Sequence, residues 1–368
     1  MSVKKLLRKN FEYLQAMSVP EYTLYRKWED LNQKEYTMDD RQRIWEIKNS
    51  LWTPEHPDDY LKLQPDIINV TNKDDSVTWT ILRNFISTMT WRQSVGRIMR
   101  FIIYDKRTST YLGVLSLASD FISLSPRDNH IGWNYDTRIN KRMLNYTAMG
   151  SSIVPTQPLG FSYVGGKLLT LMLCSDKVVN AWDAKYGHKE KLIAMTTTSL
   201  YGGFSQYNNL KHWKKCGSTE GKIPLEPSDA VYKKIREWVK EKYPNDFRKL
   251  TVNKDKILSR PKNKLLAFAY TKLGIKPPDN DAPRGVYFCK LYKNSNEFLS
   301  MKDNVTSEVA FDNRLSTLVD LWKEKYASKR IKSLERSGRT KLTSLFYDDI
   351  IHKTWNEVKE KYLVEVGR

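Results

Sequence analysis

The stretch SLYGGFSQYNNLKHW at residues 199–213 gathers side chains whose types and spacing could do chemistry. Tyr201 and Tyr207 each carry a hydroxyl that can serve as a general acid in catalysis. Asn208 and Asn209 carry amides that can hydrogen-bond to another amide or to the edge of a nucleobase. The double glycine in the same stretch also suits an ordinary tight turn. The sequence therefore predicts either a structural turn or the wall of a site in which the two tyrosines are catalytic.

Other side chains that could bind a substrate lie in this stretch and in the earlier motif IGWNYDTR. Gly203 permits close approach by a ligand, and Trp213 offers a ring for stacking on a base, although such an aromatic more often belongs to a core. In IGWNYDTR, Trp133, Asp136 and Arg138 occur together, which suits an ion-paired structural turn at least as well as a site. On the functional interpretation these five residues and the two asparagines contact the substrate.

A second candidate site begins at the motif FSYVGGK, which follows an expected strand at 152–161 and opens an apolar helix. The first N–H groups of a helix have no partner within the helix, and glycine lets a phosphate or pyrophosphate approach them closely. The opposing interpretation is that two small residues merely allow the helix to pack tightly against the strand. On the binding interpretation, the residues that hold a cofactor are Gly160, Val164, Gly165, Gly166 and Lys167.

Several other kinds of reaction centre lack their local signatures. The sequence contains no GxxxxGK[ST], HExxH, GxSxG or CxxC motif, which argues against phosphate-loop hydrolysis, zinc proteolysis and serine-hydrolase chemistry. Cys174, Cys216 and Cys289 lie far apart and have no histidine at ligand spacing, so we expect neither a disulfide framework nor a metal site. A nuclease with scattered acids stays open, because any long chain offers such carboxylates.

The chain is strongly basic, with 62 Lys and Arg against 42 Asp and Glu and a formal charge of +20. A surplus of this size favours a polyanionic partner, and we expect nucleic acid, DNA in particular, rather than a membrane. A dense run of basic residues follows Trp322. Such a run is usually a helix face exposed to solvent, but it can also contact the phosphates of a nucleic acid. The residues expected to contact nucleic acid are Lys329, Arg330, Lys332, Arg336 and Arg339.

The elements that would position these groups alternate between strand and helix. After charged N-terminal helices the pattern gives an antiparallel hairpin within 97–119, a strand at 152–161, a buried helix and a strand at 191–198. This order predicts an α/β (α+β) fold in which helices lie on a mixed sheet. We expect four consecutive parts: a helical region at 1–75, a core domain at 76–225, a basic helical segment with a closing strand at 226–305, and a basic amphipathic helical region at 306–368.

Apolar spacing predicts two helices in more detail. In TMDDRQRIWEIKNSLW, Thr37 or Asp39 can cap the start, and the packing stripe comprises Ile44, Trp45, Ile47 and Leu51. The helix opened by FSYVGGK is apolar nearly all round, so we expect one buried helix that ends at Gly187. No segment is apolar over the length needed to span a bilayer, and we expect a soluble protein of the cytoplasm, that of a bacterial host if a phage encodes it.

The order strand, glycine-containing loop, buried helix and strand resembles the core of GNAT-type acyl-CoA transferases. The resemblance implies a GNAT-like mixed sheet in which the strand before the loop splays from the next strand. It implies that the loop binds the pyrophosphate of acetyl-CoA or another acyl-CoA, and that a tyrosine after the following strand, here Tyr207 or Tyr201, protonates the departing thiolate. The usual RxxGxG/A loop of that family is replaced here by PLGFSYVGG.

A more specific resemblance lies in a series of blocks between about residues 88 and 222: WRQSVG, a hairpin ending VLSLAS, IGWNYDTR, WDAKYGHK and YGGFSQYNNLKHWKKCGSTEGK. Their order resembles the DruA-type family of Druantia anti-phage systems and its relatives in phages and mobile elements. The chain is more remotely similar to Mom-type phage enzymes, which modify adenine in DNA on a GNAT scaffold. Where the DruA-type family usually has Asn-Thr-Arg, this chain has Ala148-Met149-Gly150, a departure consistent with altered or lost activity.

Two functions from different classes follow from these resemblances. The first is a DNA-acting transferase that modifies a nucleobase or another amine from an acyl-CoA-like donor, and it predicts that Gly165 and Gly166 face a cleft shared with Tyr207. The exocyclic amine of a base is shielded within a duplex, so such an enzyme would also have to flip the base. The second is a non-catalytic nucleic-acid-binding protein on the same fold, acting in phage defence, counter-defence or packaging.

Overall fold

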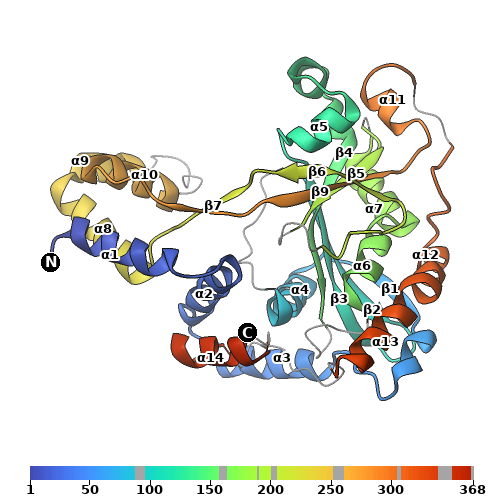
Figure 1. Ribbon diagram of the computed structural model, residues 1–368, viewed down its shortest axis with the longest axis horizontal. Helices are drawn as coiled ribbons and strands as arrows, with labels where there is room; N and C mark the ends of the chain where they lie inside the picture. The colour runs from blue at the N-terminus through green and yellow to red at the C-terminus, as the bar shows by residue number, and fades with distance from the viewer. Residues whose placement is uncertain are drawn as a thin grey trace. The chain divides into compact units, whose positions relative to one another are not determined.

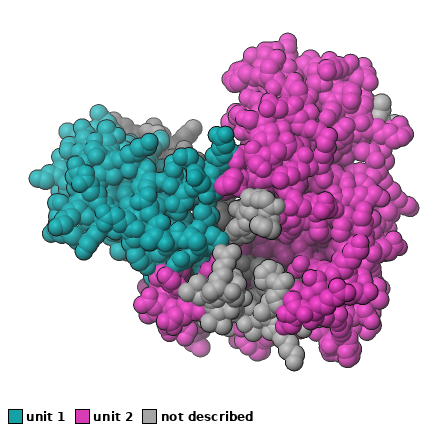
Figure 2. Space-filling model, viewed as in Figure 1, with its two compact units in different colours: residues 1–33, 220–282 teal, residues 34–219, 283–368 magenta. Residues whose placement is uncertain are grey.

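Two compact units make up the structure, and each unit joins two segments that are distant in the sequence (Figures 1 and 2). Unit 1 comprises residues 1–33 and 220–282, and unit 2 comprises residues 34–219 and 283–368. This division differs from the four consecutive parts expected from the sequence. The computed structural model describes residues 1–87, 96–156, 164–188, 190–199, 205–251, 261–304, 308–338 and 350–365.

Among the described residues, unit 2 is built on a seven-stranded sheet in the order β1-β2-β3-β4-β5-β9-β6. Neighbouring strands in this order are antiparallel except β4 and β5, which run parallel. A mixed sheet with helices packed on it confirms the α+β class predicted from the sequence. The strands are β1 Pro65–Asn69, β2 Ile98–Asp105, β3 Thr110–Ser119, β4 Thr147–Pro155, β5 Ala194–Thr198, β6 Trp213–Thr219 and β9 Arg284–Lys290.

β2 and β3 form the antiparallel hairpin that the sequence predicts. The register pairs Asp105 with Thr110 at the polar turn. The buried carboxylate of Asp105 holds this turn, because it accepts hydrogen bonds from the hydroxyl of Thr108 at 2.7 Å and from the N–H of Gln64 at 2.6 Å. A buried carboxylate needs such donors, so the polar residues at this turn serve the fold.

β4 and β5 form a short parallel pair and then part. Their pairing starts where Thr147 meets Ala194 and ends where Met149 meets Thr196, although β4 continues beside β3. β4 begins earlier, and β5 begins later, than the sequence predicted. Beyond Met149 the two parallel strands are no longer paired, and helix α6 follows β4 along the chain.

The helices of unit 2 cover the sheet and one another. α4 and α6 pack against β3 and β4, α5 packs against β6 and β9, and α12 packs against α6. The α-helices are α3 Met38–Asn49, α4 Lys73–Ile86, α5 Ser125–Ile131, α6 Gly165–Leu173, α7 Asp176–Tyr186, α11 Ser295–Leu299, α12 Leu315–Trp322, α13 Ser328–Arg336 and α14 Trp355–Glu365.

Helix α3 begins at the cap that the sequence predicts. The Thr37 hydroxyl accepts a hydrogen bond from the Asp40 N–H, and the Asp40 carboxylate accepts one from the Thr37 N–H, which is a reciprocal capping box. Ile44 and Ile47 are buried as predicted, but Trp45 is 59% exposed, so its assignment to the packing stripe was wrong. Trp45 is turned about 100° around the helix from Ile44, away from the core.

The apolar segment after FSYVGGK forms two helices, α6 and α7, rather than the single helix expected. The break follows from contacts with a distant segment: the N–H of Asp176 donates to the carbonyl of Asn313, and the Asp176 carboxylate accepts from the N–H of Leu315. A local apolar pattern carries no information about such partners. α7 ends before Gly187, as predicted.

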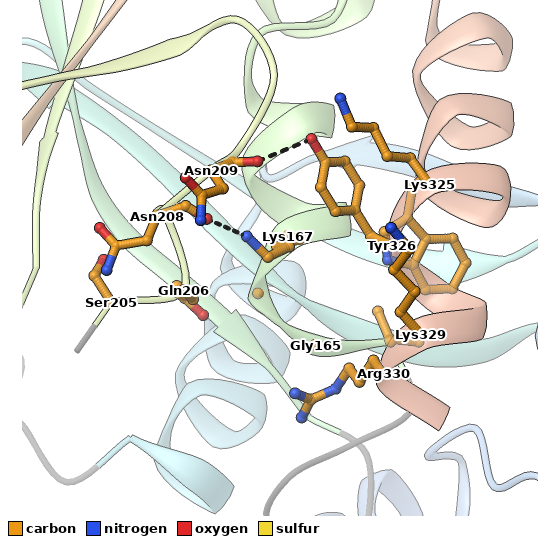
Figure 3. A pocket seen from close by; sticks show the side chains of 13 residues that line it. Gly165, Lys167, Ser205, Gln206, Asn208, Asn209, Lys325, Tyr326, Lys329 and Arg330 are labelled. Atoms are coloured by element: carbon orange, nitrogen blue, oxygen red, sulfur yellow. Dashed lines mark hydrogen bonds between the residues drawn. The ribbon is translucent and has the colours of Figure 1, made fainter. Parts of the chain in front are cut away.

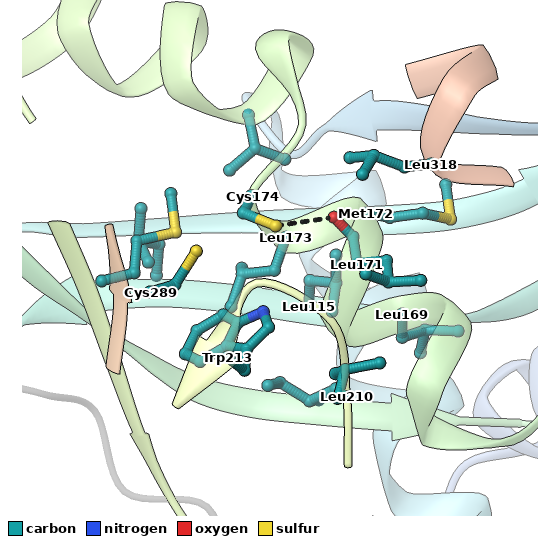
Figure 4. Close-up of a cluster of buried hydrophobic side chains, with 14 of the residues drawn as sticks. Leu115, Leu169, Leu171, Met172, Leu173, Cys174, Leu210, Trp213, Cys289 and Leu318 are labelled. Atoms are coloured by element: carbon teal, nitrogen blue, oxygen red, sulfur yellow. Dashed lines mark hydrogen bonds between the residues drawn. The ribbon is translucent and has the colours of Figure 1, made fainter. Parts of the chain in front are cut away.

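Figure 4 shows the apolar core around α6. Leu169, Leu171 and Leu173 are fully buried there, and burial of each such side chain stabilises the fold by about 1.5–3 kcal/mol. Leu318 of α12 belongs to the same cluster. This packing fixes α6 against the sheet and therefore fixes the position of its N-terminus.

Unit 1 consists of helices and a two-stranded sheet. α1 packs with α8, and α8 packs with α9 and α10, which is why the N-terminal helices belong with a segment two hundred residues later. No helix among the described residues combines the length and the apolar character needed to cross a bilayer. The elements are α1 Val3–Gln15, α2 Val19–Asn32, β7 Lys222–Pro224, α8 Asp229–Lys242, α9 Pro244–Thr251, α10 Pro261–Leu273 and β8 Asp279–Asp281.

Candidate functional site

A cavity of about 560 Å³ lies in unit 2 at the start of α6 (Figure 3). The turn 205–209 forms one side, the helix carrying Lys325 and Arg330 forms the other, and Lys167 projects between them. The cavity is therefore built from three chain segments that are remote in sequence. Its lining residues are Val164, Gly165, Gly166, Lys167, Ser205, Gln206, Asn208, Asn209, Trp322, Lys325, Tyr326, Lys329 and Arg330.

Two glycines shape the start of α6. Gly165 has a φ of +62°, a left-handed conformation that side chains other than glycine adopt at a cost, and a Cβ there would lie 3.0 Å from Nε of Arg330. At Gly166 a Cβ would lie 1.5 Å from Oε1 of Gln206, so the amide of Gln206 rests directly on the backbone. The helix cap is Val164, whose side chain has no oxygen to bind the first N–H groups.

The asparagines hold the turn 205–209 in place. Lys167 Nζ donates to the carbonyl of Asn208 at 2.6 Å, and the hydroxyl of Tyr287 donates to the Asn208 Oδ1 at 2.6 Å. Asn209 has a φ of +56°, and its carbonyl accepts a hydrogen bond from the hydroxyl of Tyr326 at 3.2 Å. These contacts tie the turn to α6, to β9 and to the helix that carries Lys325 and Arg330, so the turn is both structural and part of a cavity wall.

The cavity is strongly cationic. Among its described lining residues are Lys167, Lys325, Lys329 and Arg330, and none of the lining residues is an Asp or a Glu. Burial, together with the nearby charge of Arg330, lowers the pKa of Lys167 below its ordinary value. The ring of Tyr326 lies 5.1 Å from Lys167 Nζ, close enough for a cation–π contact. Cations gathered in this way repel one another, and a bound anion would relieve that repulsion.

Trp322, one of the lining residues, carries a buried polar atom without a partner among the described residues. Its side chain is fully buried, and its indole Nε1 makes no hydrogen bond to any described residue. A buried donor left unsatisfied costs about 1–3 kcal/mol.

Tyr207 is not among the described residues that line the cavity. Its side chain is 7% exposed, and its ring packs edge-on against Tyr287 with 5.2 Å between ring centroids. Its hydroxyl meets the side chains of Gln206 and Thr197, and burial raises its pKa. Tyr207 therefore lies behind the cavity wall, next to the lining residues Gln206 and Asn208.

The substrate residues expected in IGWNYDTR lie apart from the cavity. Trp133 is buried and donates from Nε1 to the carbonyl of Leu299 at 2.6 Å. Arg138 is buried and forms an ion pair with Asp128 at 2.6 Å, whereas Asp136 is exposed. The structure thus gives this motif the ion-paired turn that was the alternative interpretation.

The remaining expected site residues do not line the cavity among the described residues. Trp213 is 5% exposed and packs in the core of unit 2 beside Leu210 and Cys289 (Figure 4). Lys332 and Arg336 are exposed on α13 and do not line the cavity among the described residues. Gly160, Tyr201, Gly203 and Arg339 lie outside the described residues.

Sequence reasoning did not assign Gln206, Trp322, Lys325 or Tyr326 to the site. Lys325 lies in the basic run, and its charge was the one signal that marked it. Trp322 and Tyr326 fall on the apolar side of an amphipathic helix, where an aromatic residue is read as core. In the described part of the chain, no three His, Cys, Asp or Glu side chains are grouped to hold a metal ion.

The family model described as "DruA: Druantia protein DruA" matches residues 21–300. The chain belongs to the DruA family. This membership supports a connection with phage defence, and it confirms the family resemblance seen in the sequence blocks. The DruA match includes α6 and the turn 205–209. Trp322 and the cavity cations Lys325, Lys329 and Arg330 lie beyond its end.

A curated relative is the Druantia protein DruA of Escherichia coli (strain UMEA 4076-1). It is 27% identical over 197 residues, which cover 48% of this chain and 48% of that relative. The match to this DruA protein therefore spans about half of its length. No solved structure matches the chain.

Proposed function

We propose that this protein is a DNA-acting transferase with a GNAT-like core, working in phage defence, and that it binds an acyl-CoA or a chemically similar donor at the start of α6. The observation that carries the proposal is the cavity there, with four cations and no carboxylate among its described lining residues. An acyl-CoA carries a pyrophosphate, and cations beside a glycine-led helix start suit such an anion. A volume of about 560 Å³ suits part of a cofactor of that size.

The strands beside α6 support a GNAT-like core. β4 and β5 run parallel, pair only from Thr147 to Met149 on the β4 side, and then part. In the GNAT-type fold the strand before the pyrophosphate loop splays from the next strand in this way. The turn 205–209, which follows β5 along the chain, reaches the same cavity.

When bound, an acyl-CoA supplies a thioester whose carbonyl carbon accepts the attacking amine. A C–N bond forms, the C–S bond breaks to release the CoA thiolate, and the proton lost by the amine is balanced by protonation of that thiolate. The residues of this chain would bind and orient the reactants. Lys329 and Arg330 would neutralise the pyrophosphate, which would approach the backbone at Gly165 and Gly166 after the exposed side chain of Gln206 has moved aside. A base amine would have to leave the DNA duplex first, and exposed cations of α13 such as Lys332 would hold neighbouring phosphates.

One observation favours the second function, nucleic-acid binding without catalysis in phage defence, counter-defence or packaging. Tyr207, the residue expected to protonate the thiolate, is 7% exposed and is not among the described residues that line the cavity. Its raised pKa and its burial make it a poor proton donor to a group in the cavity. On this alternative the cavity binds a phosphate of nucleic acid and no group is transferred.

Calorimetric titration with acetyl-CoA tests donor binding. Lys329→Gln should weaken binding about tenfold, which corresponds to about 1.4 kcal/mol, because the lost charge faces the cavity. Lys332→Gln is the matched control, since it removes an exposed charge from the same helix without touching the cavity. Absence of acetyl-CoA binding, or equal losses in both variants, would contradict a donor site here.

Mass spectrometry of nucleosides separates the two functions. DNA digested from cells that express the protein should contain a modified nucleoside absent from cells that lack it. A modified nucleoside would reject the non-catalytic alternative and would identify the base and the added group. Unmodified DNA, together with salt-sensitive DNA binding, would reject transfer to DNA and favour the alternative.

A further inference from the structure

A second cavity of about 460 Å³ lies in unit 2 at the ends of β6 and β9. It is distinct from the cavity at α6, although Asn209 lines the first cavity and His212, three residues later, lines the second. We call it the aromatic cavity. Its lining residues are His130, His212, Trp213, Lys214, Phe288, Lys290, Ala310 and Phe311.

Flat rings form most of the wall of the aromatic cavity. His212 and Phe311 are stacked, with 3.8 Å between ring centroids and 16° between ring planes. His130 meets Phe288 edge-on, with 5.3 Å between centroids. Aromatic walls of this kind bind planar heterocycles by stacking, and they tolerate different bases because each base has a π face.

The charged groups at the aromatic cavity are cations. Lys214 and Lys290 line it, and no Asp or Glu is among its described lining residues. Neither lysine forms an ion pair with another described residue. A phosphate attached to a planar heterocycle would therefore find a counter-charge beside the rings.

The two histidines add neutral hydrogen-bonding groups. Burial, with the charges of Lys214 and Lys290, lowers the pKa of His130; burial, with Lys211 and Lys325, lowers the pKa of His212 to about 4. Both rings are therefore neutral near pH 7, and each offers one donor and one acceptor nitrogen. The Nε2 atom of His130 is buried and makes no hydrogen bond to any described residue.

The backbone conformation of His212 also indicates a ligand site at the aromatic cavity. Its φ is +72°, a conformation that a non-glycine residue adopts at a cost of about 1–3 kcal/mol. The strained backbone places the imidazole against Phe311 at the cavity wall. Strain of this kind is concentrated at ligand sites, where the surrounding structure maintains it.

We propose that the aromatic cavity binds a nucleotide, with the base stacked against the ring-lined wall and the phosphate at Lys214 and Lys290. A free nucleotide and a base extruded from DNA share the same chemistry, a planar heterocycle joined to a phosphate. Of these two ligands, we assign the cavity to a base of DNA. This assignment rests on the proposed function, because DNA is the substrate proposed there. It adds an acceptor-side site next to the proposed donor cavity.

The test uses the full chain and short single-stranded oligodeoxynucleotides. One oligonucleotide carries a single 2-aminopurine among abasic positions, and its partner is abasic throughout. The first should bind about tenfold more tightly, because the free energy of stacking one base corresponds to about a tenfold change in affinity. Its fluorescence should also be quenched by the stacking. Phe311→Leu, which keeps an apolar side chain but removes the stacking ring, should abolish both the difference in affinity and the quenching.

A pair of neighbouring lysines provides the matched control for charge. Lys214 and Lys215 are both exposed on β6, but Lys214 alone of the two lines the aromatic cavity. Lys214→Gln should weaken binding of the 2-aminopurine oligonucleotide several-fold more than Lys215→Gln does. Phe247→Leu, at a partly buried aromatic of unit 1, controls for loss of an aromatic elsewhere.

Three outcomes decide the inference. Equal binding of both oligonucleotides, or quenching that survives Phe311→Leu in a folded variant, would overturn it. Quenching by free 2-aminopurine nucleotide as strong as by the oligonucleotide would support the cavity and make a free nucleotide its source. Arg330→Gln should abolish acetyl-CoA binding and leave the quenching intact, so failure of the donor site and failure of the aromatic cavity are distinguishable.

Discussion

At the scale of single residues, the surroundings of His212 set its protonation. Burial, and then the charges of Lys211 and Lys325, lower its pKa to about 4 from the ordinary 6.5. Between these two pH values the unfolded chain binds a proton that the folded chain does not, so stability should fall as pH drops through this window. His212→Gln should flatten that dependence.

Nuclear magnetic resonance of the histidine side chains measures this pKa. The His212 resonance, assigned by its absence in His212→Gln, should titrate at about 4 in the folded protein. In denaturing urea the pKa of the same ring should be about 6.5. A folded-state pKa close to the ordinary value would mean that water or an anion reaches this ring.

The residues around Arg127 show what the sequence could not predict. Arg127 is fully buried, and it pairs with Asp120 at 2.7 Å and with Asp128 at 2.6 Å, while Arg138 pairs with Asp128. The motif IGWNYDTR indicated an ion-paired turn, but its partners lie earlier in the chain. A buried charge must be paired, and the sequence alone does not say with which residue.

At the scale of elements, the motif FSYVGGK predicted a glycine-led helix start, and α6 begins at Gly165. The approach of an anion to this helix start stays a prediction; a cationic cavity lies there. Gly166→Ala should weaken acetyl-CoA binding about tenfold, or about 1.4 kcal/mol, because a methyl group would cover the backbone that the ligand reaches by displacing Gln206. The measurement is calorimetric titration.

The same substitution should leave thermal stability nearly unchanged. Gln206 is exposed, so its side chain can move aside, and alanine is favoured over glycine within a helix. Gly165→Ala is the contrasting control, because its φ of +62° should cost about 1–2 kcal/mol of stability. Undiminished acetyl-CoA binding by Gly166→Ala would show that the ligand does not approach the helix backbone there.

The sequence predicted elements well where local signals decide them. The β2–β3 hairpin and the cap of α3 rest on turn and capping residues, and both are confirmed. The break between α6 and α7 was missed because a distant partner of Asp176 makes it. The basic wall of the cavity was missed as part of this site, because Lys325 and Tyr326 meet α6 only after the chain has folded.

At the scale of the whole molecule, unit 1 interrupts unit 2 at one hairpin position. Thr219 ends β6 and Arg284 begins β9, and these two residues pair directly across the antiparallel strands. A two-residue turn is the shortest connection between strands paired in this way, and Asn-Gly suits it. A variant that lacks residues 1–33 and carries Asn-Gly in place of 220–283 should therefore fold as unit 2, with cooperative thermal unfolding and the acetyl-CoA binding of the full chain.

DNA binding by this variant should persist but depend less on salt. Both units contain more Lys and Arg than Asp and Glu, so each contributes to attraction of a polyanion. The logarithm of affinity falls with the logarithm of salt concentration by about 0.9 for each duplex phosphate neutralised. If both units contact DNA, removal of unit 1 should reduce the magnitude of this slope by about 0.9 or more, the amount expected for one phosphate contact. An unchanged slope in a folded variant would confine DNA contact to unit 2 and to cations such as Lys332 and Arg336, whose replacement by glutamine would then lower the slope instead.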